Sequence, residues 1–397
     1  MLIFLLIKGV PARTTRVATI GGVLNRGEMD IVMNPHDEKA LEAADYVKRC
    51  VGGKVIALSM GPDSKLAPIM ENLYQAEVEG IDESVILSDR QMAGGDTLVT
   101  AYTISRGIKK ALDIHVAAID ELLSLLHDPD LCLAKASSLF QANLIPNHVF
   151  SDLASVRNTI MGEYSIGVKS KKDVEDSLQQ LKRSIFQFTV LAGVKTTDGE
   201  TGSVGPQVAE ALSEMLQQSV PHATYVHDFQ VLPGCDGLTI EHRIASSIRT
   251  MQAVFPALLT IASEYRSGIP ATSDLRSVRR NNYRGKILSP AIWDAKMIEA
   301  DPACLGLAGS PTWVGAGYDV GGPPSQRYIA STKIISADLD TVSIGGKTYG
   351  PFKKGQLINE LDSPVLEYLE NKRLVKTFDY SDLMDELFGD SNNGAGV

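Results

Sequence analysis

The sequence predicts an α/β protein built on a mainly parallel, Rossmann-like sheet with helices on both faces. In its first half, short aliphatic runs alternate with amphipathic stretches, which is the pattern of parallel strands joined by helical crossovers. Of the 397 residues, 44% are hydrophobic and 22% are charged, so the chain can bury a full core. We also expect antiparallel strands near the end of the sheet, a helical insertion and a small C-terminal appendage.

Four aliphatic runs are expected to form buried strands, at residues 2–7, 54–59, 84–87 and 188–191. A helix is predicted over residues 38–49, because Leu41, Ala44 and Val47 recur at the helical spacing. It is preceded by Asn34 as a candidate N-cap and by Pro35, which suits a first helical position. Further helices are expected over residues 64–79 and 96–112.

The pattern then changes to polar, helix-prone pieces, which we interpret as a helical insertion over residues 113–186. A decorative surface bundle is the commoner explanation of such an insertion, and docking of a partner is the alternative. After a helix over 205–220, the runs 223–231, 238–244 and 251–261 are expected to be antiparallel strands. From Thr272 to Pro324 the chain is expected to be irregular, with a cluster of arginines near residue 280 and the run Gly309-Ser310-Pro311-Thr312. In the unit that follows, Gly345-Gly346 is expected to form a turn between two strands. We therefore assign 1–112 and 187–324 to one nucleotide-binding domain, and 325–397 to a small appendage with a flexible tail.

Composition and charge exclude several functions. The net charge of −10 argues against nonspecific binding to nucleic acid or anionic membranes. The four cysteines are far apart, so no CxxC pair is present to build a metal or redox site, and a reducing cytoplasmic location fits best. The apolar run at the start is too short to span a membrane and lacks the features of a signal peptide.

A glycine-rich segment between a predicted strand and a predicted helix is the strongest local signal. In residues 193–207, Gly199 and Gly202 allow backbone N–H groups to turn inward, and Thr201 and Ser203 supply hydroxyl donors. The following helix offers its positive N-terminus to phosphate. The segment is neither a Walker loop nor a GxGxxG fingerprint, so a plain loop is an equally good interpretation of the residues alone.

Two further loops follow predicted strands. In one, Asp96 is suited to cap a helix while Thr97 and Thr100 could donate to phosphate; the other is the segment 34–37. Loops after parallel strands meet at one edge of a sheet, so all three are expected to converge. We find no HExxH pair of histidines and no GxSxG elbow, and we predict no catalytic side chain and no metal site. A nucleotide site without an acid–base set indicates cofactor carriage or redox chemistry.

Six short motifs, in the order in which they occur along the chain, resemble those of the β subunit of electron transfer flavoproteins. The resemblance covers about residues 1–112 and 186–322. It is carried by Leu5-Leu6-Ile7-Lys8-Gly9-Val10-Pro11, Leu24-Asn25-Arg26, Met33-Asn34-Pro35-His36-Asp37, Ala57-Leu58-Ser59-Met60-Gly61-Pro62, Asp96-Thr97-Leu98 and Asp198-Gly199-Glu200-Thr201-Gly202-Ser203-Val204-Gly205-Pro206-Gln207.

The resemblance implies a heterodimer with an α subunit that carries a mobile flavin, while the β subunit holds either AMP or a second FAD. In bifurcating members the β-bound FAD takes hydride from NADH and splits the two electrons between two acceptors. The forms Asp96-Thr97 and 201–206 look like the FAD-holding type. A dehydrogenase or another redox protein would then be a further partner.

The resemblance also implies site residues. Adenine and ribose contacts would fall on Leu6, Asn34, Asp37 and Met60, and pyrophosphate contacts on Asp96, Thr97, Thr100, Thr201, Gly202, Ser203 and Val204. The other expected cofactor-binding residues belong to the same glycine-rich segment: Gly193, Lys195, Thr196, Asp198, Gly199 and Gly205.

The chain departs from the family pattern in two places. Lys195-Thr196 stands where the family often has Gln-Ala, which adds a positive charge near the flavin or its phosphates. Residues 267–284 differ from the loop that grips acyl-CoA dehydrogenases, so the redox partner is left open. Two other functions also stay open, a non-bifurcating carrier that holds structural AMP and a nucleotide-sensing regulatory module.

Overall fold

The computed structural model describes residues 1–12, 19–20, 23–24, 30–75, 81–160, 171–265, 289–312, 333–358 and 363–377. The chain divides into two compact units, a large one that runs to Gly315 and a small one from Ala316 onward that also takes in residues 21–23.

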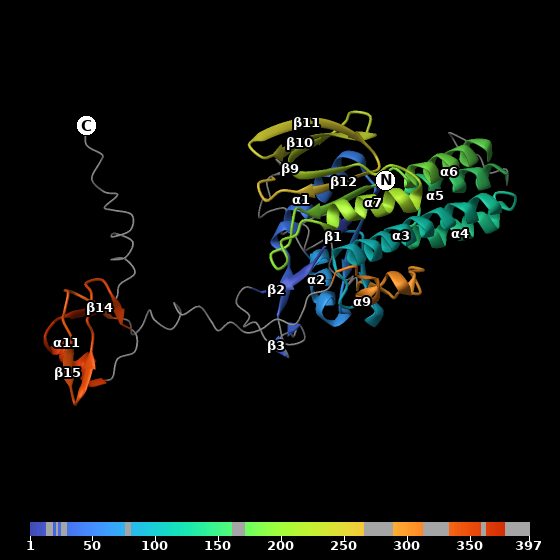
Figure 1. Cartoon of the computed structure of the whole chain (residues 1–397). Coiled ribbons are helices and arrows are strands. Elements are labelled where there is room, and N and C mark those ends of the chain that lie inside the picture. The colour runs from blue at the N-terminus through green and yellow to red at the C-terminus, as the bar shows by residue number, and fades with distance from the viewer. Residues whose placement is uncertain are drawn as a thin grey trace, which may run out of the picture. The chain divides into compact units, whose positions relative to one another are not determined.

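The large unit is built on a sheet of nine strands in the order β11-β10-β9-β12-β8-β1-β6-β7-β13 (Figure 1). Six of them run parallel to their neighbours at its centre and at one edge: β1 (Leu2–Leu6), β6 (Lys54–Met60), β7 (Glu83–Leu87), β8 (Thr189–Gly193), β12 (Ala257–Ile261) and β13 (Ala291–Trp293). At the other edge, β9 (His222–Val231), β10 (Gly237–Ile244) and β11 (Ser247–Val254) pair antiparallel with one another. The predicted fold class is confirmed.

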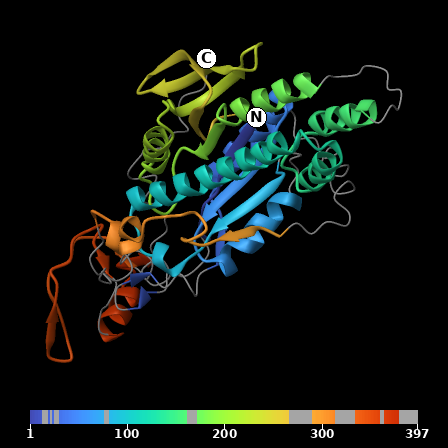
Figure 2. The same cartoon turned by 90° about the vertical axis from the view of Figure 1, so that its right-hand side faces the viewer.

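Alternation along β1 explains why both faces of the sheet are covered. Leu2, Phe4 and Leu6 belong to one hydrophobic cluster, whereas Ile3 and Leu5 belong to another on the opposite face. The first cluster is completed by helices α3 (Thr97–Leu125) and α7 (Val204–Leu216), and the second by α1 (Pro35–Val51) and α2 (Asp63–Gln75). Figure 2 shows the long helix α3 crossing in front of the sheet.

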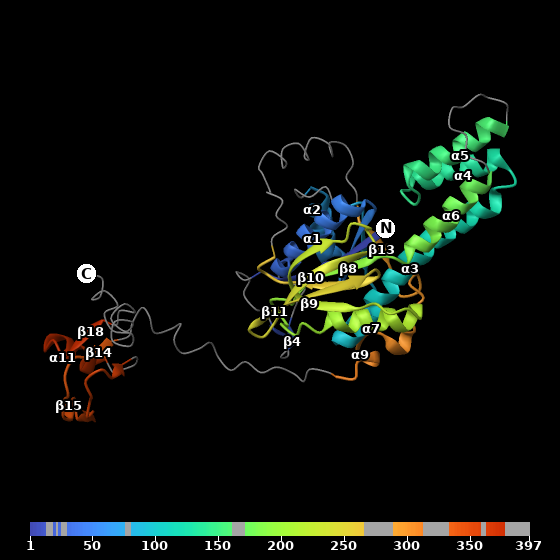
Figure 3. The same ribbon diagram turned by 90° about the horizontal axis from the view of Figure 1, so that it is seen from above.

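The helices between β7 and β8 form an arm that extends beyond the sheet (Figure 3). It contains the second half of α3 together with α4 (Pro129–Gln141), α5 (Asn147–Ile160) and α6 (Lys171–Ile185). The expected break near Asp113 is wrong, because α3 is one continuous helix of 29 residues. The polar residues there lie on the solvent side of a helix whose other side stays buried, at Leu112, His115 and Ile119.

Two other strand predictions need correction. The run 251–261 does not form one antiparallel strand: it ends β11 at Val254, and from Ala257 it continues as β12, which is parallel to both β8 and β9. The segment expected to be irregular contains β13, which extends the sheet beyond β7. A three-residue strand in an irregular stretch offers too few residues to show an alternation.

The remaining elements are short. In the large unit, β2 (Gly9–Pro11) pairs with β5 (Ile31–Met33), and further elements are β3 (Thr19–Ile20), η2 (Arg90–Met92), η3 (Pro302–Cys304) and α9 (Gly306–Gly309). β4 spans Val23–Leu24. No helix in the described ranges is both long and apolar enough to cross a membrane.

The small unit has a core of its own, made by Ile335, Phe352, Val365 and Leu369. β14 (Lys333–Ile335) pairs with β17 (Leu357–Ile358) and β18 (Val375–Thr377), and α11 spans Ser363–Asn371. β15 (Val342–Ile344) and β16 (Lys347–Tyr349) form a hairpin, and Gly345 and Gly346 at its turn have φ of 60° and 82°, as the predicted Gly-Gly turn requires. The tail that the sequence predicts to be flexible, the arginine cluster near residue 280 and Asn25-Arg26 lie outside the described residues.

Candidate functional site

A buried carboxylate joins three segments at the carboxyl edge of the sheet. Oδ2 of Asp37 accepts from the backbone N of Lys8, which follows β1, at 2.8 Å. Oδ1 accepts from the backbone N of Gly193 at the end of β8, at 3.2 Å, and from Nδ2 of Asn34, at 2.9 Å. The start of α1 is thereby fixed between two neighbouring parallel strands, where ligands of such sheets bind.

Burial raises the pKa of the Asp37 carboxyl to about 7, although the hydrogen bonds from Lys8, Asn34 and Gly193 and the charge of Lys8 oppose this shift. The side chain is only 5% exposed, and its oxygens are taken up by donors of the chain itself. In this arrangement Asp37 positions the edge of the sheet, and the contact with ribose that the resemblance implies stays a prediction.

Asn34 lies immediately before α1 but does not cap the helix with its side chain. Its Nδ2 donates to Asp37 and also to the backbone O of Lys195, at 3.0 Å. Asn34 is fully buried, and its Oδ1 has no hydrogen-bond partner within the described part of the chain. Asn34 therefore lies at the predicted N-cap position, but its side-chain amide connects α1 to the glycine-rich segment instead of capping the helix.

Gly193 is required by this close approach. A β-carbon at this position would lie 2.5 Å from Oδ1 of Asp37 and 2.7 Å from the carbonyl carbon of His36. Any larger residue would push α1 away from β8. Gly193 thus serves the packing that brings the loops together.

Two lysines lie at the glycine-rich segment, Lys195 within it and Lys8 beside it, and each is paired with a carboxylate. Nζ of Lys8 lies 2.8 Å from Asp198, and Nζ of Lys195 lies 3.3 Å from Oε1 of Glu200. Burial alone would raise the pKa of Asp198, but hydrogen bonds from Lys8 and Thr196 and the charge of Lys8 together hold it below its usual value. The added positive charge of Lys195 is thus partly balanced within the loop.

The turn that leads into α7 has the form expected of an anion cradle. Glu200 and Gly202 both have positive φ, of 51° and 63°, which turns the chain sharply. Ser203 precedes α7 without a side-chain cap, and its hydroxyl donates to the backbone O of Thr201 at 3.3 Å. Thr201 and Gly202 are exposed, so the uncapped positive end of α7 faces solvent together with these polar groups.

Gly199 and Gly205 differ in their surroundings. A β-carbon at Gly199 would meet only Oγ1 of Thr196, at 3.8 Å, whereas one at Gly205 would overlap the methyl group of Thr260. The structure therefore shows Gly205 at the contact between α7 and β12, where it allows close packing. Val204, the first residue of α7, is partly buried against the core cluster.

Asp96 begins α3 as predicted, accepting at Oδ1 from the backbone N of Leu98 and Val99. Its Oδ2 accepts from the hydroxyl of Thr312 at 2.6 Å, and Ser310 Oγ accepts from the backbone N of Asp96 at 2.9 Å. The hydroxyl of Thr100 donates to the backbone O of Asp96 at 2.8 Å, and its donation to a phosphate stays a prediction.

The starts of α3 and α7 meet at Gln207. Its side-chain amide nitrogen, in the orientation that satisfies both ends of the amide, donates to the backbone O of Thr97 at 3.0 Å and to Thr97 Oγ1 at 3.1 Å. Sequence reasoning missed Gln207 and Thr312 as positioning residues. Gln207 ends the quoted motif and Thr312 lies in a noted Gly-Ser-Pro-Thr run, but only the folded chain shows their contacts.

Leu6 and Met60 lie at the carboxyl ends of β1 and β6, respectively. Leu6 is 6% exposed and belongs to the core, and Met60 packs partly exposed against the same cluster. They form the apolar border of the region. Among the described residues, no three His, Cys, Asp or Glu side chains gather as metal ligands.

The residues that follow β1 and β8 and those at the starts of α1, α3 and α7 together form a polar region at one edge of the sheet. The apolar ends of β1 and β6 border it. Its direct links are Asn34 to Lys195, Lys8 to Asp198, and Thr97 to Gln207. The region holds the hydroxyls of Thr201 and Ser203, the uncapped start of α7, and the ammonium groups of Lys8 and Lys195, each of which is paired with a carboxylate. A helix start of this kind suits an anion such as a phosphate.

Comparison with known proteins points in one direction. Residues 21–148 match the family model described as the electron transfer flavoprotein domain. The electron transfer flavoprotein subunit beta of Thermoanaerobacterium thermosaccharolyticum is 27% identical over 316 residues, which cover 79% of this chain and 86% of that protein. The subunit beta of Clostridium acetobutylicum is also 27% identical, over 79% of this chain and 86% of its own length. The caffeyl-CoA reductase-Etf complex subunit CarD of Acetobacterium woodii is 24% identical over 89% of this chain and 92% of that protein.

Proposed function

This chain carries an electron transfer flavoprotein domain and is a relative of electron transfer flavoprotein β subunits; from that premise we propose that it holds FAD at the carboxyl edge of its sheet and accepts hydride from NADH. Its broader role is that of an electron transfer flavoprotein β-like subunit. The proposal adds the cofactor, the electron donor and the route of the electrons.

One observation carries the proposal: hydrogen bonds connect loops that follow separate strands, and these loops lie beside the uncapped start of α7. Asn34 reaches Lys195, and Gln207 reaches Thr97, so the cradle and both helix starts have fixed relative positions. A preformed set of donors of this kind binds a pyrophosphate with little further ordering of the chain.

We assign the chain's residues to parts of the cofactor accordingly. The backbone of 201–205 and the hydroxyls of Thr201 and Ser203 would face the pyrophosphate, together with the start of α3 at Asp96 and Thr97. The ends of β1 and β6, at Leu6 and Met60, would border the adenine. Asp37, Asn34 and Gly193 would hold the loops in place from below.

A bound FAD would supply the redox chemistry, taking hydride from NADH and passing the electrons, by flavin-based bifurcation, to the flavin of an α subunit and to a second acceptor. The chain itself needs no acid or base for the transfer of hydride, because its task is to position the cofactor and the donor and to exclude competing reactions. The name of the CarD relative, which places that protein in a caffeyl-CoA reductase-Etf complex, supports a heterodimer that works with a dehydrogenase or another redox partner.

Extraction and chromatography of the bound nucleotide tests the proposal. The chain purified with its α partner is expected to release two FAD per heterodimer and to oxidise NADH. One FAD and one AMP would replace the proposal by a non-bifurcating carrier, and bound ATP would favour a regulatory module.

Lys195 offers a test that depends on the sign of a charge. If its ammonium group lies near the flavin, Lys195→Gln removes stabilisation of the anionic reduced form and lowers the flavin's potential by about 30 mV for each 1.4 kcal/mol lost. Glu200→Gln is the matched control, because it releases Lys195 from its partner at 3.3 Å and should raise the potential instead. Spectroelectrochemistry of both variants measures the shifts, and unchanged potentials in both would remove Lys195 from the site.

A further inference from the structure

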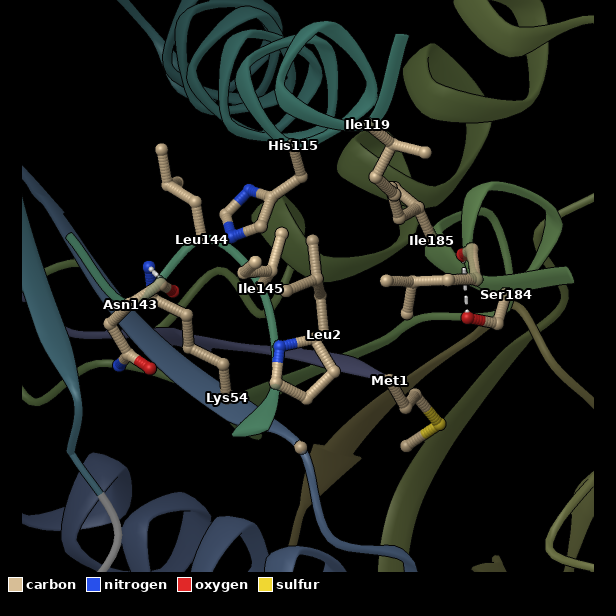
Figure 4. Close-up of a pocket in the computed structure, with 13 residues that line it drawn as sticks. Met1, Leu2, Lys54, His115, Ile119, Asn143, Leu144, Ile145, Ser184 and Ile185 are labelled. Carbon is tan, nitrogen blue, oxygen red and sulfur yellow. Dashed lines mark hydrogen bonds between the residues drawn. The ribbon is translucent and has the colours of Figure 1, made fainter. Parts of the chain in front are cut away.

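The amino edge of the sheet, opposite the loops described above, contains a cavity of about 190 Å³. It lies where the starts of β1 and β6 meet α3, α6 and the turn between α4 and α5 (Figure 4). Nothing in the proposed function uses this cavity.

Most of the cavity wall is apolar. Leu2, Ile145 and Ile185 are buried side chains of the main core cluster, and Ile119 and Leu144 also line the space. Such a lining favours an apolar occupant, because polar molecules would lose hydrogen bonds to water without replacing them.

His115 gives this apolar wall one specific polar group. Its side chain is 6% exposed, and Figure 4 shows the ring extending from α3 toward Leu144 and Ile145. Nδ1 lies 2.8 Å from the backbone O of Ala111. Because a carbonyl oxygen can only accept, Nδ1 carries the proton, and Nε2 is left as an acceptor. Nε2 is buried and has no hydrogen-bond partner among the described residues.

Two other polar side chains at the wall, those of Lys54 and Ser184, are already engaged. Nζ of Lys54 pairs with Glu83 Oε2 at 2.6 Å and donates to the backbone O of Asn143 at 3.1 Å. The hydroxyl of Ser184 donates to the backbone O of Leu181 at 2.7 Å. The buried acceptor with an unmet hydrogen bond is therefore Nε2 of His115.

We propose that this cavity is a binding site for a small, mainly apolar molecule with one hydrogen-bond donor, which it gives to Nε2 of His115. A phenol is the simplest member of this class. A cavity of roughly 150 Å³ lined by apolar side chains can hold benzene, so this larger one has room for a substituted ring.

The protonation state of the histidine suits this role. Burial lowers the pKa of His115, and the nearby charge of Lys54 lowers it further. The ring is neutral at pH 7, and Nε2 then keeps its lone pair. A ligand without a donor would leave that acceptor buried and unsatisfied.

A matched pair of probes tests the site in the full chain. p-Cresol and toluene have nearly the same shape, but only p-cresol has a donor. Ligand-observed NMR titration is expected to show p-cresol binding about tenfold more tightly, which is what one buried hydrogen bond contributes. The 15N resonance of His115 Nε2 should move with p-cresol and stay in place with toluene.

Two variants separate the acceptor from the cavity. His115→Phe keeps an aromatic ring but removes the acceptor, and should bind p-cresol no more tightly than toluene. Ile185→Phe keeps Nε2 but fills the space, and should bind neither. Circular dichroism and urea unfolding check that each variant is folded.

Binding of neither probe at millimolar concentration, or equal binding of both by the wild-type chain, would overturn the proposal. So would a preference for p-cresol that persists in His115→Phe. If His115→Phe does not fold, the wild-type discrimination and the Nε2 resonance still decide the matter. These outcomes are independent of whether the chain holds FAD.

Discussion

Asp37 illustrates how one buried side chain can organise a region of the fold. Its carboxyl group accepts from the backbone of Lys8, the backbone of Gly193 and the amide of Asn34, which belong to three different segments. The sequence motif singled out Asp37, and its contact with a ribose stays a prediction. Its burial depends on a fold that no local pattern describes.

The raised pKa of Asp37 predicts a pH dependence of stability. Its folded pKa of about 7 lies above the ordinary value of 3.8, so the folded chain retains a proton that the unfolded chain releases. The stabilisation is complete below about pH 4 and is lost as the pH rises toward 7, at no more than about 1.4 kcal/mol per pH unit. We expect the free energy of urea unfolding to fall over this window.

Asp37→Asn should remove this slope, because the amide does not titrate. The variant should also be less stable throughout by about 1–3 kcal/mol, since the amide nitrogen would face a donor. Urea unfolding of both proteins at pH 5, 6 and 7 measures the difference in slope. Equal slopes would mean that Asp37 stays ionised in the folded chain.

Gly205 offers a second residue-scale prediction. In Gly205→Ala the new methyl group overlaps that of Thr260, so α7 must move away from β12, at a cost of about 1–3 kcal/mol in unfolding free energy. Gly199→Ala is the matched control and should have little effect, because its β-carbon meets only Thr196 Oγ1, at 3.8 Å. Urea unfolding compares the two.

A compensating change identifies the cause. Thr260→Ser removes the overlapping methyl group and keeps the hydroxyl that donates to Thr224, at 3.1 Å. The double variant should recover most of the stability lost in Gly205→Ala. No recovery would place the loss elsewhere in the helix.

At the scale of elements, α3 connects the two edges of the sheet. It begins at Thr97 beside the candidate cofactor region and carries His115 into the cavity at the opposite edge. The sequence predicted a helix over residues 96–112 and the start of an insertion at residue 113, because polar residues interrupt the apolar pattern near Asp113. The helix continues since its buried side remains apolar, at Ile108, Leu112 and Ile119.

The arm is expected to be held by its apolar contacts. Leu178 of α6 is fully buried, so Leu178→Ala should lower the free energy of unfolding by about 2–5 kcal/mol. Lys182, on the same helix, pairs with Asp120 of α3 at 2.6 Å, but both side chains are a third or more exposed. Lys182→Ala should therefore cost less than about 1 kcal/mol.

Hydrogen exchange of the amides in α6 measures both effects. Leu178→Ala should accelerate exchange there far more than Lys182→Ala does. The reverse order would show that the ion pair, and not the apolar core, fixes the arm.

At the scale of the whole molecule, the chain has two units with separate cores. Among its described residues, the small unit buries a core cluster of Ile335, Phe352, Val365 and Leu369, in which Phe352 supplies the aromatic ring. Small cores supply little stability beyond what folding costs. Its fold therefore depends strongly on each of these contacts.

Phe352→Ala should unfold the small unit, since removing a buried phenylalanine costs about 3–5 kcal/mol. The NMR signals of residues 333–377 should lose their dispersion, while those of the large unit and its nucleotide content stay unchanged. Lys353→Ala, at the neighbouring exposed position, is the control. A loss of nucleotide in Phe352→Ala would show that the cofactor site depends on the small unit.

The sequence by itself determined the fold class, the central strands and the motif that carries the family resemblance. It could do so because aliphatic strands, amphipathic helices and a glycine-rich turn are local patterns, each visible within about ten residues. The Gly-Gly turn between β15 and β16 and the Asp96 cap were predicted correctly for the same reason.

Only the tertiary structure decided how these pieces are used. The parallel pairing of β12, the addition of β13 and the contact of Gly205 with Thr260 join residues far apart in the chain. The same holds for Nε2 of His115, whose surroundings come from several elements of the sheet and the arm. Burial and hydrogen bonding are properties of what surrounds a residue, and those surroundings exist only once the chain has folded.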